Sequence, residues 1–162
     1  YIADPRCRTP HFGDTEPGSR DRSPMNTTNH DLDADGLLTL ANIVHVMLAD
    51  GKIDDREMEL LRSVAHRLGL LSTPTVEELL EIGMSMGNTF SSPRGPQLCL
   101  AECLRVASAD GEIHDTEIRA WKQLAISFGY SPTAAEAALK AGIEALATTP
   151  DPFDAIRRSL KP

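Results

Sequence analysis

Two short acidic segments, sixty residues apart, hold the side chains best suited to chemistry in this chain. The first runs from Asp50 to Glu57 (DGKIDDRE) and the second from Asp110 to Glu117 (DGEIHDTE). Each segment places several carboxylates within eight residues. Carboxylates that converge repel one another unless a cation neutralises them, and hard oxygen ligands favour Ca²⁺ or Mg²⁺. The two segments are therefore candidate sites for a divalent cation.

The six candidate metal ligands occupy matching positions in the two segments. They are Asp50, Asp54, Glu57, Asp110, His114 and Glu117. His114 stands where the first segment has Asp54, and an imidazole ligand would shift the second site toward Zn²⁺ or Mn²⁺. The residue types thus leave four cations open, which are Ca²⁺, Mg²⁺, Mn²⁺ and Zn²⁺.

The same residues also have a purely structural interpretation. Gly51 and Gly111 supply the positive φ that a sharp turn between two helices needs. Glu57 follows Asp54 by three residues, which is the spacing of a capping box. In the second segment the cap is His114, a poor one, or it shifts to Asp115. Capping needs one acid or hydroxyl per helix, so it accounts for only part of the acids, and both interpretations stay open.

Calcium loops of the EF-hand type are a poor fit to these segments. The two ligand positions before Asp50 would be Val46 and Leu48, which offer no side-chain oxygen. The matching positions in the second segment are Val106 and Ser108, of which only Ser108 has a side-chain oxygen. Residues 31–42 (DLDADGLLTLAN) space their aspartates correctly but end on Asn42, where such a loop needs a bidentate glutamate. We interpret that stretch as an acidic lead-in to the first helix.

The elements that must position these acids are helices. Aromatic residues are only 4% of the chain, which disfavours strands, and apolar residues recur at helical spacing with no convincing alternation. Helices are predicted near residues 38–49, 54–68, 74–87, 96–109, 115–128, 132–147 and 152–160. Starts are marked by Thr73-Pro74, Ser131-Pro132 and Asp151-Pro152. The predicted fold class is all-α, a compact bundle of about seven helices.

An internal repeat organises this bundle. Residues 49–70 and 109–130 are identical at eight of 22 positions when shifted by 60. Most of the other apolar positions match in type, such as Leu61 with Trp121. The repeat predicts two pseudo-symmetric units, each a helix, a DG loop and a further helix, that bury their apolar faces against each other.

The composition shifts near residue 30. Residues 1–30 are rich in proline and poor in apolar side chains, so they are predicted to be a disordered tail, with one helical domain over 31–162. The chain opens on Tyr1 while Met25 follows Ser23-Pro24. Residues 1–24 are thus either sequence foreign to the native start at Met25 or a native flexible tail.

Composition also excludes several classes of function. The net charge of −8 argues against nucleic-acid binding, which needs basic patches. No apolar run is long enough for a membrane span. The chain has three cysteines, and this odd number argues against a disulfide scaffold. Cys99 and Cys103 lie four residues apart and are expected to be buried small side chains. No nucleotide-binding, hydrolase or zinc-protease motif is present, so we do not expect an enzyme.

The doubled ADG-x-I-x-D-x-E helix pair in an acidic, all-helical chain resembles the TerB family of bacterial tellurite-resistance proteins. The resemblance covers residues from about 37 to 147. It implies a bundle of about seven helices, a cytoplasmic location, no enzymatic activity, an acidic surface suspected of binding metal ions, and a role in tellurite and stress resistance. Asp50, Asp54, Glu57, Asp110 and Glu117 match its acidic positions, whereas His114 departs from the usual acid or hydroxyl.

Two functions therefore compete. The first is an acidic TerB-like protein of the stress response that binds divalent cations. The second is a protein-interaction module, since similar domains occur fused to DnaJ-type co-chaperones, in which the acidic loops only cap helices. We expect a protein partner and a monomer or weak dimer. A cation that binds only the folded chain raises its stability, which distinguishes the two.

Overall fold

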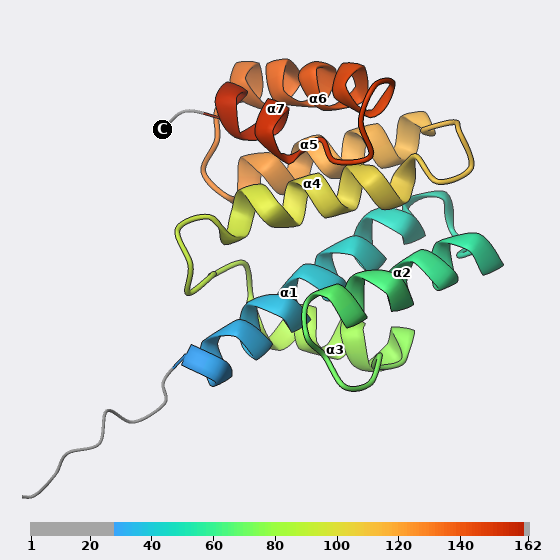
Figure 1. Cartoon of the computed structure of the whole chain (residues 1–162), viewed down its shortest axis with the longest axis vertical. Helices are drawn as coiled ribbons and strands as arrows, with labels where there is room; N and C mark the ends of the chain where they lie inside the picture. Colours follow the sequence, from blue (N-terminus) through green and yellow to red (C-terminus); the bar gives the residue numbers. More distant parts are fainter. Residues whose placement is uncertain (1–27, 161–162) are drawn as a thin grey trace, which may run out of the picture.

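A computed structural model describes residues 28–160, which form helices and contain no strand. The elements are α1 (Thr28–Met47), a short 3₁₀ helix η1 (Leu48–Asp50), α2 (Asp55–Arg67), α3 (Val76–Met86), α4 (Gly95–Ala107), α5 (Asp115–Ser127), α6 (Pro132–Leu146) and α7 (Phe153–Ser159). The prediction of an all-α bundle of about seven helices is confirmed (Figure 1).

Helices α1 and α4 pack side by side at the centre of the molecule (Figure 1). α1 contacts α2, α3, α4 and α5, and α4 contacts α1, α2, α5, α6 and α7. Every residue from Leu38 to Met47 except His45 is buried, as a helix enclosed on all sides requires. Trp121 of α5 donates its indole N–H to the carbonyl oxygen of Leu100 at 2.8 Å, which fixes α5 against α4.

The two ends of the bundle are built differently. Among the described helices, α3 contacts α1 alone, whereas α6 contacts α4, α5 and α7. Helices α2 and α5 do match the sixty-residue offset, since Asp55–Arg67 and Asp115–Ser127 have corresponding bounds. The repeat thus fits the helices that follow the acidic loops, and the pseudo-symmetry of the whole units stays a prediction.

The first helix begins ten residues earlier than the predicted start at residue 38. α1 begins at Thr28, so it includes three residues of the predicted tail, while residues 1–27 lie outside the described residues. Apolar periodicity could not report these first turns because they carry few apolar side chains. Residues 31–42 lie within α1 and so form no EF-hand loop, as expected.

The predicted caps of α3 and α7 were wrong, and the N-cap residue of α7 is Pro152 rather than Asp151. α3 is capped by Thr75, whose hydroxyl accepts the N–H of Glu78 while the Glu78 carboxylate accepts the N–H of Thr75, so the cap is not Thr73 before Pro74. His45 is exposed, because its side of α1 opens onto the surface. The predicted cap of α6 is confirmed, since Ser131 accepts the N–H of Ala134 at 3.1 Å.

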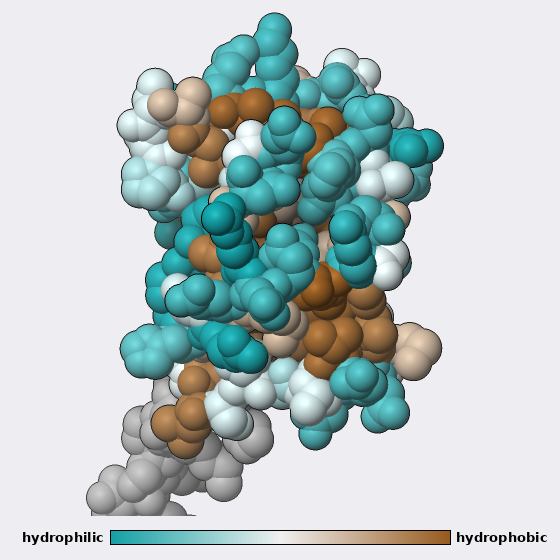
Figure 2. Space-filling view, turned by 90° about the vertical axis from the view of Figure 1, so that its right-hand side faces the viewer, coloured by the Kyte–Doolittle hydropathy of each residue, from teal (hydrophilic) through white to brown (hydrophobic). Residues whose placement is uncertain are grey.

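The surface is mostly hydrophilic, and apolar side chains gather in limited areas of the face shown in Figure 2. The large apolar side chains exposed in the described part of the chain are Leu71, Met84, Met86, Leu98, Ile126 and Ile143. They come from several helices and one loop, and isolated residues of this kind are normal on a protein surface.

Candidate metal site at the paired acidic loops

Both acidic segments form the same turn. Gly51 has φ of 91° and Gly111 has φ of 92°, in the left-handed region that glycine adopts without strain. Oδ1 of Asp50 accepts the backbone N–H two residues later at 3.1 Å, and Oδ1 of Asp110 does the same at 3.0 Å. The predicted glycine turns are confirmed, and each leading aspartate uses one oxygen to hold its own turn.

The helices after these turns begin with capping glutamates. In α2, Asp54 Oδ1 accepts the N–H of Glu57 at 2.8 Å, and Glu57 Oε2 accepts the N–H of Asp54 at 2.7 Å. In α5, Glu117 Oε2 accepts the N–H of His114 at 2.8 Å. His114 is the N-cap residue of α5, so the cap does not shift to Asp115. The capping interpretation therefore holds for both glutamates.

The fold also brings the two loops close to each other. η1, which ends at Asp50, packs against α5. Burial raises the pKa of Glu57 above its ordinary value, although the N–H of Asp54 opposes this by stabilising the carboxylate, and the charges of Asp54, Asp50 and Asp110 raise the pKa further. Asp110 belongs to the second loop, so its negative charge acts on a glutamate that follows the first loop.

The charges of the first loop act in turn on the pKa of Glu117, which follows the second loop. It is only 3% exposed, and this burial is the main cause that raises its pKa. The N–H and the imidazole of His114 lower the pKa, whereas the charges of Glu57 and Asp50 raise it. All six sequence-predicted ligands therefore belong to one electrostatic cluster, where the sequence predicted a separate site in each loop.

Within the described part of the chain, no lysine or arginine forms an ion pair with the central carboxylates of this cluster. The ion pairs of residues 28–160 involve none of the four carboxylates Asp50, Glu57, Asp110 and Glu117. Each of these carboxylates has one oxygen bonded to a backbone N–H, and the other oxygen has no hydrogen-bond partner among the described residues. The four free oxygens are the groups that could turn toward a cation.

The side chains are not already arranged around an ion. Within residues 28–160, no three His, Cys, Asp or Glu side chains are placed to hold a metal. The acids share a field without sharing a coordination centre, so a cation would require their side chains to rotate. Such rotation is feasible at Asp50 and Asp110, which are exposed.

The two cysteines of the described residues contribute no ligand to this site. Cys99 and Cys103 are free and buried in α4, as expected from the sequence. Burial is the main cause that raises the pKa of the Cys103 thiol, so it stays protonated, and a protonated thiol is a poor metal ligand.

Sequence reasoning missed how near the two loops are to each other, because that proximity depends on how α1 packs on α4. The sixty-residue repeat was the available signal, since two related units packed face to face bring corresponding loops together. Comparison of the chain with models of known protein families, with curated proteins and with solved structures finds no match. The TerB resemblance therefore stays a prediction from sequence. No helix in the described residues is long and apolar enough to cross a membrane.

Proposed function

We propose that this protein is a non-enzymatic helical protein that binds a divalent cation between its two acidic loops. The observation that carries the proposal is that the two loops lie against each other, since η1, which ends at Asp50, packs against α5, which begins at Asp115. In keeping with this, the charge of Asp110 raises the pKa of Glu57, and the charge of Glu57 raises the pKa of Glu117. A cation placed between these carboxylates would relieve the repulsion. An all-oxygen centre favours Ca²⁺ or Mg²⁺, and participation of His114 favours Zn²⁺ or Mn²⁺.

The sequence resemblance supports a proposed cellular role. An acidic TerB-like chain would act in tellurite or stress resistance in the bacterial cytoplasm, with a protein partner that reads its cation-bound state. The competing proposal is an interaction module without a metal site, in which Glu57 and Glu117 serve only as capping residues.

Thermal unfolding with and without cation tests the proposal. The full chain is melted in chelator and then with Ca²⁺, Mg²⁺, Mn²⁺ or Zn²⁺ in turn. A cation at a hundred times its dissociation constant adds about 2.7 kcal/mol to the free energy of unfolding. For a chain of this length that corresponds to a rise in Tm of roughly 5–11 °C.

Three variants distinguish a ligand from a cap. Asp50→Asn and Glu117→Gln each remove a charge but keep an oxygen for the backbone N–H, so we expect both to fold and to lose the cation-induced rise. Glu59→Gln is the matched control, because Glu59 is an exposed acid of α2 and is not among the charges that act on Glu57 or Glu117. Identical melting of the wild type in chelator and in all four cations would refute the metal site and favour the interaction module.

A further inference from the structure

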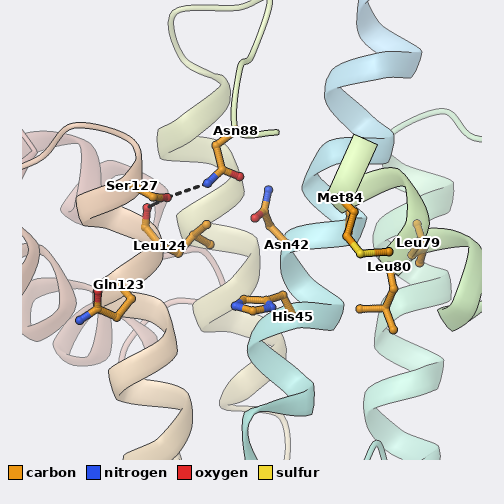
Figure 3. A pocket seen from close by; sticks show the side chains of 11 residues that line it. Asn42, His45, Leu79, Leu80, Met84, Asn88, Gln123, Leu124 and Ser127 are labelled. Carbon is orange, nitrogen blue, oxygen red and sulfur yellow. Dashed lines mark hydrogen bonds between the residues drawn. The ribbon is translucent and has the colours of Figure 1, made fainter. Parts of the chain in front are cut away.

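A groove of about 460 Å³ lies between α1, α3 and α5, with part of its lining from the loop after α3 (Figure 3). Its volume lies within the range of about 300–1,000 Å³ found for small-molecule sites. Leu79, Leu80 and Met84 of α3 form its apolar wall. None of its lining residues belongs to the acidic loops, so whatever it binds is independent of the cation site.

The lining of the groove is nearly free of charge. It includes no Asp, Glu, Lys or Arg, although these residues make up 25% of the chain. His45 is its one ionisable side chain. Apart from His45, no side chain of the lining could compensate the desolvation of a charged ligand, so the lining favours a neutral one.

Hydrogen bonds fix the orientation of Asn42, which lies beneath the groove. Asn42 is only 7% exposed, and its amide Nδ2 donates to the carbonyl oxygen of Leu38 at 2.9 Å. Because a carbonyl can only accept, the group facing Leu38 must be the NH₂. The Oδ1 atom has no hydrogen-bond partner among the described residues. Every fully buried side-chain nitrogen or oxygen of the described residues has a hydrogen-bond partner. Because Asn42 Oδ1 has none, it must be accessible to solvent. It therefore opens to the groove.

Asn88 is oriented by the same logic. The hydroxyl of Ser127 donates to the carbonyl oxygen of Leu124 at 2.7 Å, so its oxygen is left to accept the Nδ2 group of Asn88 at 2.8 Å. Asn88 Oδ1 is left without a partner among the described residues. In Figure 3 the Asn42 and Asn88 side chains point toward each other across the groove. Each of the two side chains thus leaves one carbonyl acceptor free at the groove, beside an apolar wall.

We propose that this groove binds a neutral amphipathic small molecule that presents an NH₂ group, as a primary carboxamide does. An N–H of such a group can donate to Asn42 Oδ1 or to Asn88 Oδ1. A short apolar tail would cover Leu80 and Met84, of which Met84 is 80% exposed in the free protein. The ligand would satisfy a nearly buried acceptor and remove apolar surface from water at the same time.

Two matched probes test the proposal by NMR titration of the isotopically labelled full chain. Hexanamide carries the NH₂ head and an apolar tail, whereas hexanoate has the same length but no N–H donor and a negative charge. A ligand this small binds with a dissociation constant of about 1 mM. We expect hexanamide to shift the signals of groove residues such as His45 and Gln123 saturably, and hexanoate at neutral pH to shift them without saturating.

Variants at the two acceptors complete the test. Asn42→Leu and Asn88→Ala each remove one acceptor, and Asn88 is exposed, so its variant tests the groove even if the buried substitution perturbs folding. Each is expected to weaken hexanamide about three- to tenfold, which is the worth of one hydrogen bond. Gln97→Ala removes a carboxamide of α4 outside the groove and should leave the affinity unchanged.

Three results would overturn the proposal. They are equal midpoints for hexanamide and hexanoate, an affinity for hexanamide that both acceptor variants leave within about twofold, and the absence of saturable shifts at groove residues up to about 50 mM probe.

Discussion

Gly142 lies where α6 passes closest to α4 and α7, and its replacement by alanine tests this packing. An added Cβ would lie 2.5 Å from Leu104 Cδ2 and 3.0 Å from Ile156 Cγ1, whereas carbon atoms pack at about 3.5–4.0 Å. Both neighbours are buried and have no space to move into. Overpacking of this kind lowers the free energy of unfolding by about 1–3 kcal/mol, whereas the better helix propensity of alanine raises it by about 1 kcal/mol.

The net expectation for Gly142→Ala is a loss of about 1 kcal/mol, equivalent to a fall in Tm of roughly 2–4 °C. Gly83→Ala is the matched control, since Gly83 also lies inside a helix but its Cβ would meet only Ala41 Cβ, at 3.4 Å. That is an ordinary contact, so the helix propensity gain remains and stability should rise by up to about 1 kcal/mol. Urea and thermal unfolding followed by circular dichroism measure both. A Gly142→Ala protein as stable as Gly83→Ala would refute the close approach of the three helices.

Three further outcomes are expected in urea unfolding. Because the folded state raises the pKa of Glu57 and Glu117 above 4.5, it binds protons more readily than the unfolded chain. Their contribution to the stability of the metal-free protein therefore falls as the pH rises above 4.5, and Glu117→Gln should flatten the profile of stability against pH. An unchanged profile would contradict the raised pKa of Glu117. Trp121→Phe should lower the free energy of unfolding by about 1–2 kcal/mol, because the hydrogen bond to Leu100 is lost. An unchanged free energy of unfolding would contradict a stabilising role of this bond. Asp35→Ala should cost about 1–3 kcal/mol, because its carboxylate accepts two backbone N–H groups of the loop after α3; no cost would show that the loop needs no such anchor.

The fold class could be predicted because helical periodicity is a local property. α2, α4 and α5 begin and end within two residues of the predicted bounds, since capping residues and glycines mark their ends. α1 was predicted ten residues too short, because its first turns carry few apolar side chains. The cap of α3 was misplaced because Thr73 and Thr75 are both plausible capping hydroxyls, and only Thr75 has a glutamate three residues later.

The candidate sites were predictable only where the chemistry is local. The capping role of Glu57 follows from its spacing to Asp54, and the structure has both bonds of that box. The effect of the Glu57 charge on the pKa of Glu117 depends instead on how the two repeat units pack, which the repeat suggests but does not specify for individual residues. The groove has the same origin, since Asn42 and Asn88 line it together only after three helices have packed.

The central position of α1 and α4 has a consequence for the order of events during synthesis. Leu40 and Val44 of α1 are buried in the core that α4 and α5 complete, yet α4 is complete only sixty residues after α1 ends, at Ala107 against Met47. At a ribosomal rate of about 5–20 residues per second, α1 waits roughly 3–12 s for its principal partner. During that interval α2 and α3 leave one apolar side of α1 uncovered. The nascent chain is therefore a candidate client for chaperones until α4 emerges, and the first three helices should not form a stable fragment by themselves.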